Sequence, residues 1–525
     1  MSKATCLLVT GTILLCGVLP VAGQSVNLPL DHWAYRLLER LETKGLVREV
    51  GLRALPLSRQ QVAELIAAAD RALRDHPSAF SRSERALLEQ LKGEFCDDPP
   101  VAGLEVQPRY RERHLLRWQE GESYAFVDAL FAQAVDAHAA DTMATGERQW
   151  RTMAGTIVRG AIEGKLGFYL DARNTMRRGG KVPEESFDPR HGLPVVTSGR
   201  NVYSDQAEAY AAVQFWRVHL QAGRMQAHWG PGWRGGLLLS RNAPLFDAFR
   251  LTVPFKRFSF SALHAFLTGL GRPRYLAGHR LEVRLADWLM LAGTESVLYG
   301  RRDVEFSYLN PLMPYHVAEH HLGDRDNNMM SFDVVAFPLR NVKAYAELLL
   351  DDMTLTKNPL RYYGDKFGFT LGGHWVAPIG LQEAALRAEY TRIEPFVYTH
   401  YDSLNVYLHY DRIIGHWLGP DADCLTLAAE YQWSRDIFTQ LWAQWRRHGK
   451  GDVWTPYPED GSERKSFLAG TVESATTWGA QVSDQVRKDI FVSFAYVHTA
   501  LRNRAHVAGA RGFERQASIQ VAVNY

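Results

Sequence analysis

The chain has 525 residues, a formal net charge of +2 and 22% charged residues. This near-neutral balance excludes the large basic excess of a protein that coats nucleic acid, so we expect no nucleic-acid partner. The length admits either several ordinary domains or one very large barrel with an accessory domain.

Residues 1–23 have the layout of a secretory signal peptide. An apolar run over 6–19 follows a positive residue, and the small residues Ala22 and Gly23 come next. We therefore expect the mature chain to begin near Gln24. Beyond this segment no stretch approaches the ~18 consecutive apolar residues that a spanning helix needs, so the chain is periplasmic, released, or a barrel in an outer membrane.

Residues 24–100 are predicted to form a small periplasmic bundle of three amphipathic helices. Asp31 is the expected N-cap of the first helix. Ser-x-x-Gln at 58–61 and Ser-x-x-Glu at 81–84 have the capping-box pattern and predict the starts of the second and third.

Residues 101–525 consist of alternating segments separated by Gly, Asp, Asn and Pro. In the stretch HRLEVRLADW, Leu281 and Val283 share one face of a strand, whereas Arg280 and Glu282 share the other. This alternation is typical of a transmembrane strand between lipid and a wet lumen, and also of the edge strand of a soluble sandwich.

Two further stretches favour the membrane alternative. The apolar face of CLTLAAEYQW ends in Tyr431 and Trp433, like an interfacial aromatic girdle. The last ten residues, QASIQVAVNY, alternate in the same way and end on Tyr525.

Connection lengths give an independent argument, because a barrel of this type alternates short periplasmic turns with long external loops. Counted back from the C-terminus, the predicted strands are separated by long, short, long and short connections and lie near 514–525, 489–500, 475–482, 436–447 and 424–433. The sequence thus predicts a mainly β fold, a large antiparallel transmembrane β-barrel of about 16–18 strands, with a small N-terminal α-helical bundle.

The most enzyme-like string is HVAEH at 316–320, which fits the H-x-x-E-H pattern of a zinc peptidase. That mechanism needs a helix, whereas Pro311, Pro314 and strand-like flanks predict lumen or loop residues here. Cys96 and Cys424 lack the spacing of a zinc site, and neither a G-x-S-x-G elbow nor a phosphate loop is present. We therefore expect no enzymatic activity, no metal and no cofactor.

Candidate sugar-binding residues lie in four stretches. The glycines and prolines of HWGPGWRGGLLLSRNAPLFDAFRL favour a sharp turn between two strands. The alternative interpretation is a sugar-binding site in which tryptophans offer flat apolar faces and arginines donate hydrogen bonds. RIIGHWLGPDAD, GDVWTPYPEDGSERK and RNRAHVAGARGF are assigned to external loops, which are either merely solvated or a surface for a carbohydrate that carries carboxylates. The candidate residues are Trp229, Trp233, Arg234, Arg241, Trp417, Trp454, Tyr457, Arg502, Arg504, His506 and Arg511.

Several stretches resemble the capsule assembly protein Wzi family of outer-membrane proteins. They are HWGPGWRGGLLLSRNAP, FSYLNPLMPY with the following DNNMMSFD and AYAELLLDD, and RIIGHWLGPDAD. The resemblance implies an 18-stranded barrel with a periplasmic helical bundle, in the outer membrane of a Gram-negative cell. It implies a lectin whose partners are capsular or extracellular polysaccharide, outer-membrane lipid and the polysaccharide export machinery.

The family resemblance carries no set of sugar-contacting residues that can be transferred one by one. The alternatives to a polysaccharide-binding protein are an outer-membrane porin or transport channel and, less favoured, a zinc hydrolase.

Overall fold

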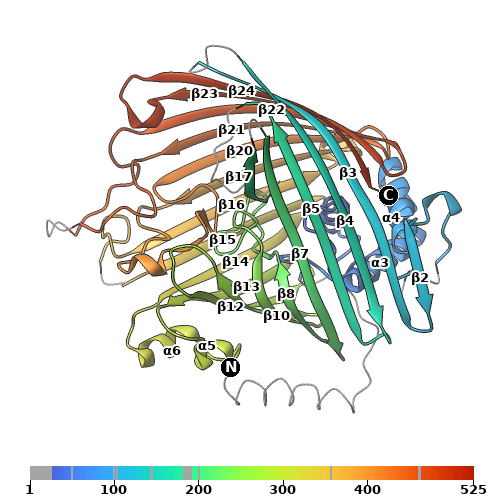
Figure 1. The fold of residues 1–525 in the computed structure, drawn as a ribbon, viewed down its shortest axis with the longest axis horizontal. Helices are drawn as coiled ribbons and strands as arrows, with labels where there is room; N and C mark the ends of the chain where they lie inside the picture. Colours follow the sequence, from blue (N-terminus) through green and yellow to red (C-terminus); the bar gives the residue numbers. More distant parts are fainter. Residues whose placement is uncertain are drawn as a thin grey trace.

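A closed antiparallel β-barrel dominates the structure, a computed structural model (Figure 1). The structure describes residues 26–48, 51–98, 101, 104–141, 146–180, 192–198, 201–354, 357–458 and 463–524. The predicted signal peptide and Tyr525 lie outside the described residues.

Within the described part of the chain, eighteen strands follow one another round the wall, and the last, β24, closes the ring on the first, β3. This confirms the predicted fold class. The wall strands are β3 (Ser123–Ala140), β4 (Glu147–Ile162), β5 (Leu166–Arg178), β7 (Asn201–Phe215), β8 (Val218–Met225), β10 (Phe246–Pro254), β11 (Phe258–Leu267), β12 (Arg274–Ala286), β13 (Leu289–Gly300), β14 (Asn327–Leu339), β15 (Val342–Asp352), β16 (Lys366–Val376), β17 (Ala384–Ile393), β20 (Ala422–Gln432), β21 (Ile437–His448), β22 (Glu473–Arg487), β23 (Ile490–Arg502) and β24 (Arg511–Asn524).

Two shorter strands, β2 (Leu116–Glu120) and β6 (Leu193–Ser198), extend the edges of β3 and β7. The last five wall strands agree with the prediction, although β22 is longer than the predicted 475–482.

The two ends of the barrel differ in the length of their connections. The turns at one end are short, as at 340–341 and 488–489, whereas the other end carries long segments such as 301–326 and 394–421. This asymmetry assigns the short-turn end to the periplasm and the other to the outside.

The outer surface of the wall is apolar. Leu281, Leu427 and Ile519 are 46%, 41% and 55% exposed, whereas Arg280 and Glu282 on the opposite face of β12 are 1% and 2% exposed. Exposed tryptophans lie near both ends of the strands: Trp216, Trp288, Trp375 and Trp433 at the short turns, and Trp150, Trp445 and Trp478 toward the long connections. This is the outward apolar band with two aromatic girdles that a membrane barrel requires.

The N-terminal bundle contains α2 (Ala34–Thr43), α3 (Arg59–Asp75) and α4 (Arg82–Glu94), with the short helices η1 (Pro77–Ala79) and η3 (Pro108–Tyr110). Both predicted capping boxes are present, at Ser58 and Ser81. The predicted cap at Asp31 is wrong, because α2 begins only after Trp33. The Ala34 N–H instead donates to Nδ1 of His32 at 3.2 Å.

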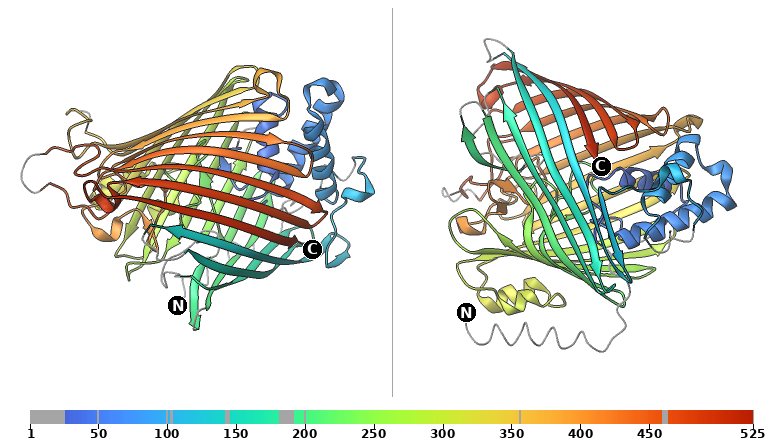
Figure 2. Two further views of the ribbon diagram at one scale, coloured as in Figure 1. Left: turned by 90° about the horizontal axis from the view of Figure 1, so that it is seen from above. Right: turned by 45° about the vertical axis from the view of Figure 1, so that its right-hand side comes forward.

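The bundle sits at the short-turn end of the barrel (Figure 2). Arg40 of α2 donates to the backbone oxygens of Gln382 and Ala384 at 3.1 and 3.3 Å, and Ser81 donates to Glu383 at 2.8 Å. All three acceptors lie in or beside the turn between β16 and β17.

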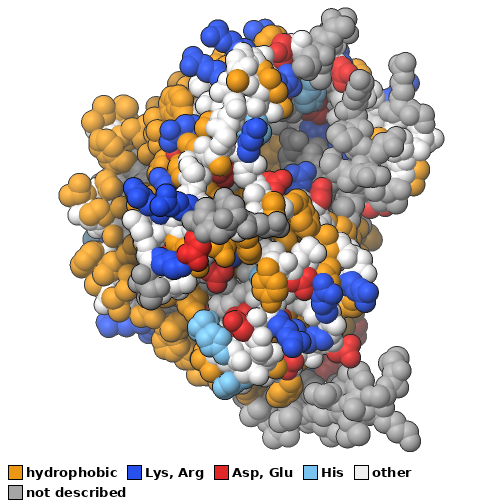
Figure 3. Space-filling view, turned by 90° about the vertical axis from the view of Figure 1, so that its left-hand side faces the viewer, with side chains coloured by type: hydrophobic (Ala, Val, Ile, Leu, Met, Phe, Trp, Pro, Cys, Tyr) orange, Lys and Arg blue, Asp and Glu red, His pale blue; other side chains and the backbone are white. Residues whose placement is uncertain are grey.

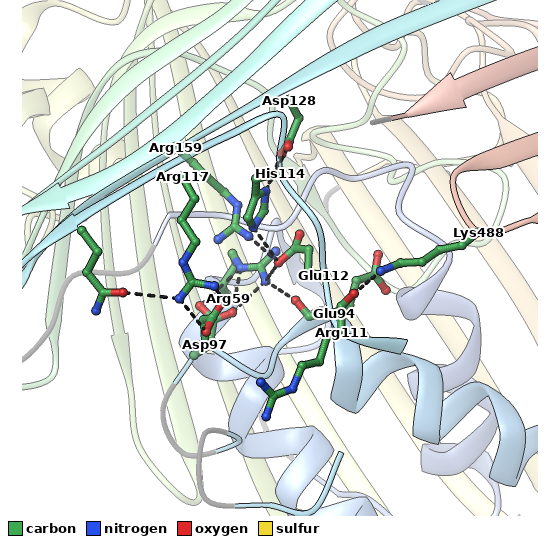
Figure 4. A network of polar contacts seen from close by, with 12 residues as sticks. Arg59, Glu94, Asp97, Arg111, Glu112, His114, Arg117, Asp128, Arg159 and Lys488 are labelled. Atoms are coloured by element: carbon green, nitrogen blue, oxygen red, sulfur yellow. Dashed lines mark hydrogen bonds and ion pairs between the residues drawn. The ribbon is translucent and has the colours of Figure 1, made fainter. Parts of the chain in front are cut away.

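A second set of contacts joins the bundle to the opposite part of the wall (Figure 4). Glu112 accepts from Arg59 of α3 at 3.4 Å and from Arg159 of β4 at 2.5 Å. His114 contacts Asp128 of β3 at 2.9 Å. Polar contacts therefore fix the bundle to the wall on two sides.

None of the helices in the described ranges is both long and apolar enough to cross a membrane. The remaining short elements are β1 (Ala54–Leu55), β9 (His228–Trp229), α5 (Phe306–Leu309), α6 (Tyr315–Leu322), η4 (Pro378–Gly380), η5 (Ser403–Asn405), β18 (Leu408–His409), β19 (Arg412–Ile413) and η6 (Arg504–His506).

Candidate functional site

The connection between β8 and β10, residues 226–245, enters the barrel instead of forming the sharp turn favoured from its sequence. Its strand β9 pairs with β1 of the bundle, and the Gly230 N–H donates to the Arg53 oxygen at 2.9 Å. We call residues 226–245 the first inward connection. The prediction failed because the segment's partners lie in the bundle, far away in the sequence.

Wall carboxylates hold the first inward connection in place. Glu389 of β17 accepts from the backbone N–H groups of Trp233 and Arg234 at 2.5 and 2.9 Å. Glu347 of β15 accepts from the Leu237 N–H at 3.1 Å. A Cβ at Gly236 would lie 2.0 Å from the Trp229 oxygen, so glycine is required at this position.

A second inward connection, residues 394–421, packs on the first. The Tyr398 hydroxyl donates to the Leu237 oxygen at 2.5 Å, and the Ser240 hydroxyl donates to the Gly415 oxygen at 2.6 Å. The string RIIGHWLGPDAD, assigned from the sequence to an exposed external loop, is therefore largely inside the barrel. Ile414 and His416 are buried.

These elements enclose a luminal cavity of about 620 Å³ between the bundle, the first inward connection and the wall. Trp233, Arg234, Arg241 and Trp417, all predicted as sugar contacts, line it together. The sequence did not identify the bundle and wall residues that complete it, notably Arg36, Lys343 and Arg387. In the sequence these residues differ from their neighbours only in being polar, at alternating positions of a strand or on a helix. Polar residues at such positions line the whole lumen, so this pattern does not single out a site.

The luminal cavity has more cationic than anionic side chains. Glu42 pairs with Arg53 at 2.6 Å, and Glu39 pairs with both Lys343 and Arg387. The remaining cationic lining residues are Arg36, Arg234 and Arg241, and no ion pair of these three appears among the described residues. An excess of arginine favours a ligand that carries carboxylates.

Two histidines of the inward connections, the half-buried His228 in the lining of the luminal cavity and the buried His416, are neutral near pH 7. Burial, together with the nearby Arg241, lowers the pKa of His228 to about 3. Burial, with Arg234 and then His228, lowers the pKa of His416 to about 3 as well. The positive charge of the cavity therefore comes from arginine and does not change near neutral pH.

A second cavity, the external vestibule, has about 360 Å³ and is lined by Trp417, by residues of β21 to β24 such as Gln444, Arg446 and Thr477, and by Arg504 of η6. Trp417 thus belongs to the lining of both cavities. Its indole N–H is buried and has no hydrogen-bond partner in the described part of the chain. Seen from the external end, cationic and acidic side chains are interspersed over this face (Figure 3).

The family model of the capsule assembly protein Wzi matches residues 119–512. The chain belongs to the capsule assembly protein Wzi family. Together with the apolar outer surface, this places the barrel in the outer membrane.

The chain is similar to solved structures. Wzi of Escherichia coli, an outer membrane protein involved in group 1 capsule assembly and described as a carbohydrate-binding β-barrel, is 14% identical, with a TM-score of 0.57 over 95% of this chain and 99% of that chain. OprD of Pseudomonas aeruginosa is 10% identical, with a TM-score of 0.44 over 76% of this chain and 94% of that chain. No curated protein sequence matches the chain.

The other predicted sugar contacts are dispersed. Trp229 is only 2% exposed, so the prediction that its indole face is open to a sugar was wrong. Tyr457 packs against Tyr363 and Phe396, and Trp454 is exposed on the 449–472 connection.

The C-terminal candidates divide between η6 and the outward face of the wall. Arg504 lines the external vestibule, where it pairs with Asp141 at 2.8 Å. His506 lies beside it in η6 and contacts the Thr471 oxygen at 2.9 Å. Arg502 and Arg511 lie directly opposite each other in β23 and β24, on the outward face, and do not line the vestibule.

The HVAEH string forms most of α6. The prediction that these residues are not helical was therefore wrong. The rings of His316 and His320 lie 4.2 Å apart, whereas Glu319 is buried, and burial with neighbouring aspartates raises its pKa to about 8. Among the described residues no three His, Cys, Asp or Glu side chains are grouped so as to hold a metal ion.

Proposed function

We propose that this protein is a lectin that retains an acidic capsular or extracellular polysaccharide at the cell surface. Membership of the Wzi family and the carbohydrate-binding description of Escherichia coli Wzi support this proposal. The observation that carries it is the position of Trp417 in both the external vestibule and the luminal cavity, whose charge is cationic. A polymer chain that enters from outside would meet the indole first and the arginines beyond it.

Each part of this path suits a different group of the sugar. The indole face of Trp417 would stack on a ring, and its unpaired N–H would donate to a hydroxyl. Arg234 and Arg241 would bind carboxylates through paired N–H groups. Individual contacts of this kind are weak, and repetition along one polymer would raise the total affinity.

The decisive experiment measures cell-bound against released polysaccharide in cells with Trp417→Ala or Arg234→Ala. Retention should fall in both, and purified protein should lose affinity for the isolated polymer. Trp433→Ala is the matched control, because this exposed tryptophan lies at the opposite, short-turn end. Unchanged retention in both cavity variants would refute the proposed path.

Other predicted contacts remain part of the proposal. Trp454, Tyr457 and His506 lie in or next to the external connections, and Arg502 and Arg511 at the external rim, where a polymer outside the barrel could meet them. The periplasmic face of the bundle is our candidate surface for the polysaccharide export machinery.

The alternative of a transport channel is less well supported. The bundle and both inward connections occupy the lumen, and the buried contacts of Glu389 and Tyr398 hold the first inward connection there. We propose that the protein is neither a channel nor an enzyme. Steady current in planar bilayers without any polysaccharide binding would favour the channel instead.

A further inference from the structure

Helices α5 and α6 pack on the outside of the barrel. Figures 1 and 2 place them beyond the ring of strands, near the external end. Tyr308 of α5 with Tyr315 and Ala318 of α6 form a buried cluster with four residues of β12 and β13: Tyr275, Ala277, Val297 and Tyr299.

The four wall residues of this cluster face outward. In β12, Tyr275 and Ala277 lie six and four positions before Leu281, which is 46% exposed. In β13, Val297 lies six positions after the exposed Leu291. Residues at such a spacing share one face of a strand. The helices therefore cover a patch of the surface that the other strands present to lipid.

A carboxylate of the wall, here called the seat at Glu295, fixes the first turn of α6 to this patch. Glu295 of β13, on the same outward face, accepts from the backbone N–H groups of Tyr315 and His316 at 2.9 and 2.6 Å. It also contacts His279 of β12 at 3.2 Å. An outward carboxylate facing lipid alone would be unfavourable, whereas here it satisfies the first N–H groups of a helix.

Large apolar side chains of the helices are exposed beside the exposed histidines His316, His320 and His321. Phe306 and Leu312 are 81% and 80% exposed, and Val317 is also exposed. On the two neighbouring strands, Phe266 of β11 and Phe332 of β14 are exposed as well. Exposed apolar side chains are therefore present both on the helices and on the wall strands beside them.

We propose that residues 304–322, here named the helical hairpin, are an interfacial anchor that lies in the outer leaflet of the membrane, with acyl chains covering Phe306, Leu312 and Val317. The seat at Glu295 lies five residues before the end of β13 at Gly300, or roughly 17 Å along the strand. The hairpin thus descends alongside the wall instead of standing above it. Its exposed His316 and His320 suit the headgroup boundary, where amphipathic helices lie.

Spin labelling tests this proposal in the full-length protein. The background is Cys96→Ser with Cys424→Ser, because these are the free cysteines among the described residues. A nitroxide is attached at Leu312→Cys, and the protein is reconstituted in vesicles of phosphatidylethanolamine and phosphatidylglycerol. The control is Leu360→Cys, an exposed leucine on the external connection 353–365, and the lipid reference is Phe332→Cys.

The ratio of collision rates with oxygen and with a water-soluble nickel chelate should be severalfold higher at Leu312 than at Leu360, and close to that at Phe332. A Leu312 ratio equal to that of Leu360 would overturn the proposal. Spin–spin broadening at Leu312 would also overturn it, because a second copy of the chain would then cover the patch. A label at Phe306→Cys repeats the measurement if the Leu312 variant does not fold.

Discussion

Replacing Glu39 with glutamine should loosen the bundle in the periplasmic mouth of the barrel. Glu39 of α2 contacts Nη2 of Arg387 at 2.7 Å and also the Lys343 ammonium, both on wall strands. Arg387 keeps a second partner in Glu430 at 2.9 Å, whereas Lys343, which is 4% exposed, loses its charged partner.

The expected magnitude follows from the burial of these groups. Breaking a buried ion pair by removal of one partner costs about 3–5 kcal/mol. The Glu39 side chain is 27% exposed, toward the luminal cavity, and Arg387 stays paired, so we expect about 2–3 kcal/mol. This raises the population of the undocked bundle roughly thirtyfold to 150-fold.

Hydrogen–deuterium exchange of the α2 peptide measures this population directly. Glu89→Gln is the matched control, because Glu89 pairs with Lys92 inside the bundle and has no ion pair with the wall among the described residues. If α2 exchanges at the same rate in wild type, Glu39→Gln and Glu89→Gln, the ion pairs do not hold the bundle.

The same contact predicts a pH dependence. Burial acts to raise the pKa of Glu39, but Arg387 and Lys343 outweigh it and hold that pKa well below the ordinary value of 4.5. A carboxylate with a depressed pKa stabilises the docked state fully above its ordinary value, and the contribution is lost as the pH falls below it. The protection factor of wild-type α2, the intrinsic exchange rate divided by the observed rate at the same pH, should therefore fall below about pH 4.5, whereas Glu39→Gln should lack this step.

Three further substitutions test individual features. Ser58→Ala should cost about 1 kcal/mol of bundle stability through the lost cap, measured by denaturant melting of the bundle signal, whereas Asp31→Ala should cost nothing comparable. Gly236→Ala should abolish polysaccharide binding while the barrel still shows heat-modifiable gel mobility, and Gly373→Ala, whose Cβ would lie 3.7 Å from its nearest neighbour, should bind normally. Leu427→Arg should destabilise the barrel by about 2–4 kcal/mol in lipid refolding titrations, because this leucine faces outward in the middle of β20; unchanged stability would contradict the membrane orientation.

The barrel wall was predictable because its signal is local. Arg280 and Leu281 fall on opposite faces by the period of two alone, and the structure confirms both positions. The capping boxes at Ser58 and Ser81 are equally local, since each involves residues three apart.

The candidate site was only partly predictable, because its geometry depends on distant partners. Trp233, Arg234 and Trp417 were chosen for their chemistry, but their meeting in one cavity depends on Glu389 and on the pairing of β9 with β1. The helix at HVAEH was missed for the same reason. Its first N–H groups are satisfied by Glu295 on the wall, which no pattern within the string reveals.

The position of the bundle links ligand binding to closure of the lumen. Glu39 and Arg36 of α2 line the luminal cavity, and Glu39 also fixes α2 to the wall. A ligand that binds only the docked arrangement must stabilise it by an amount that grows with ligand concentration. A polysaccharide bound in the luminal cavity should therefore slow exchange in α2, and Trp417→Ala should weaken this protection without changing exchange in the absence of polymer. A protein built in this way would hold its polymer most firmly when the periplasmic end is closed, which suits retention at the surface better than passage through the membrane.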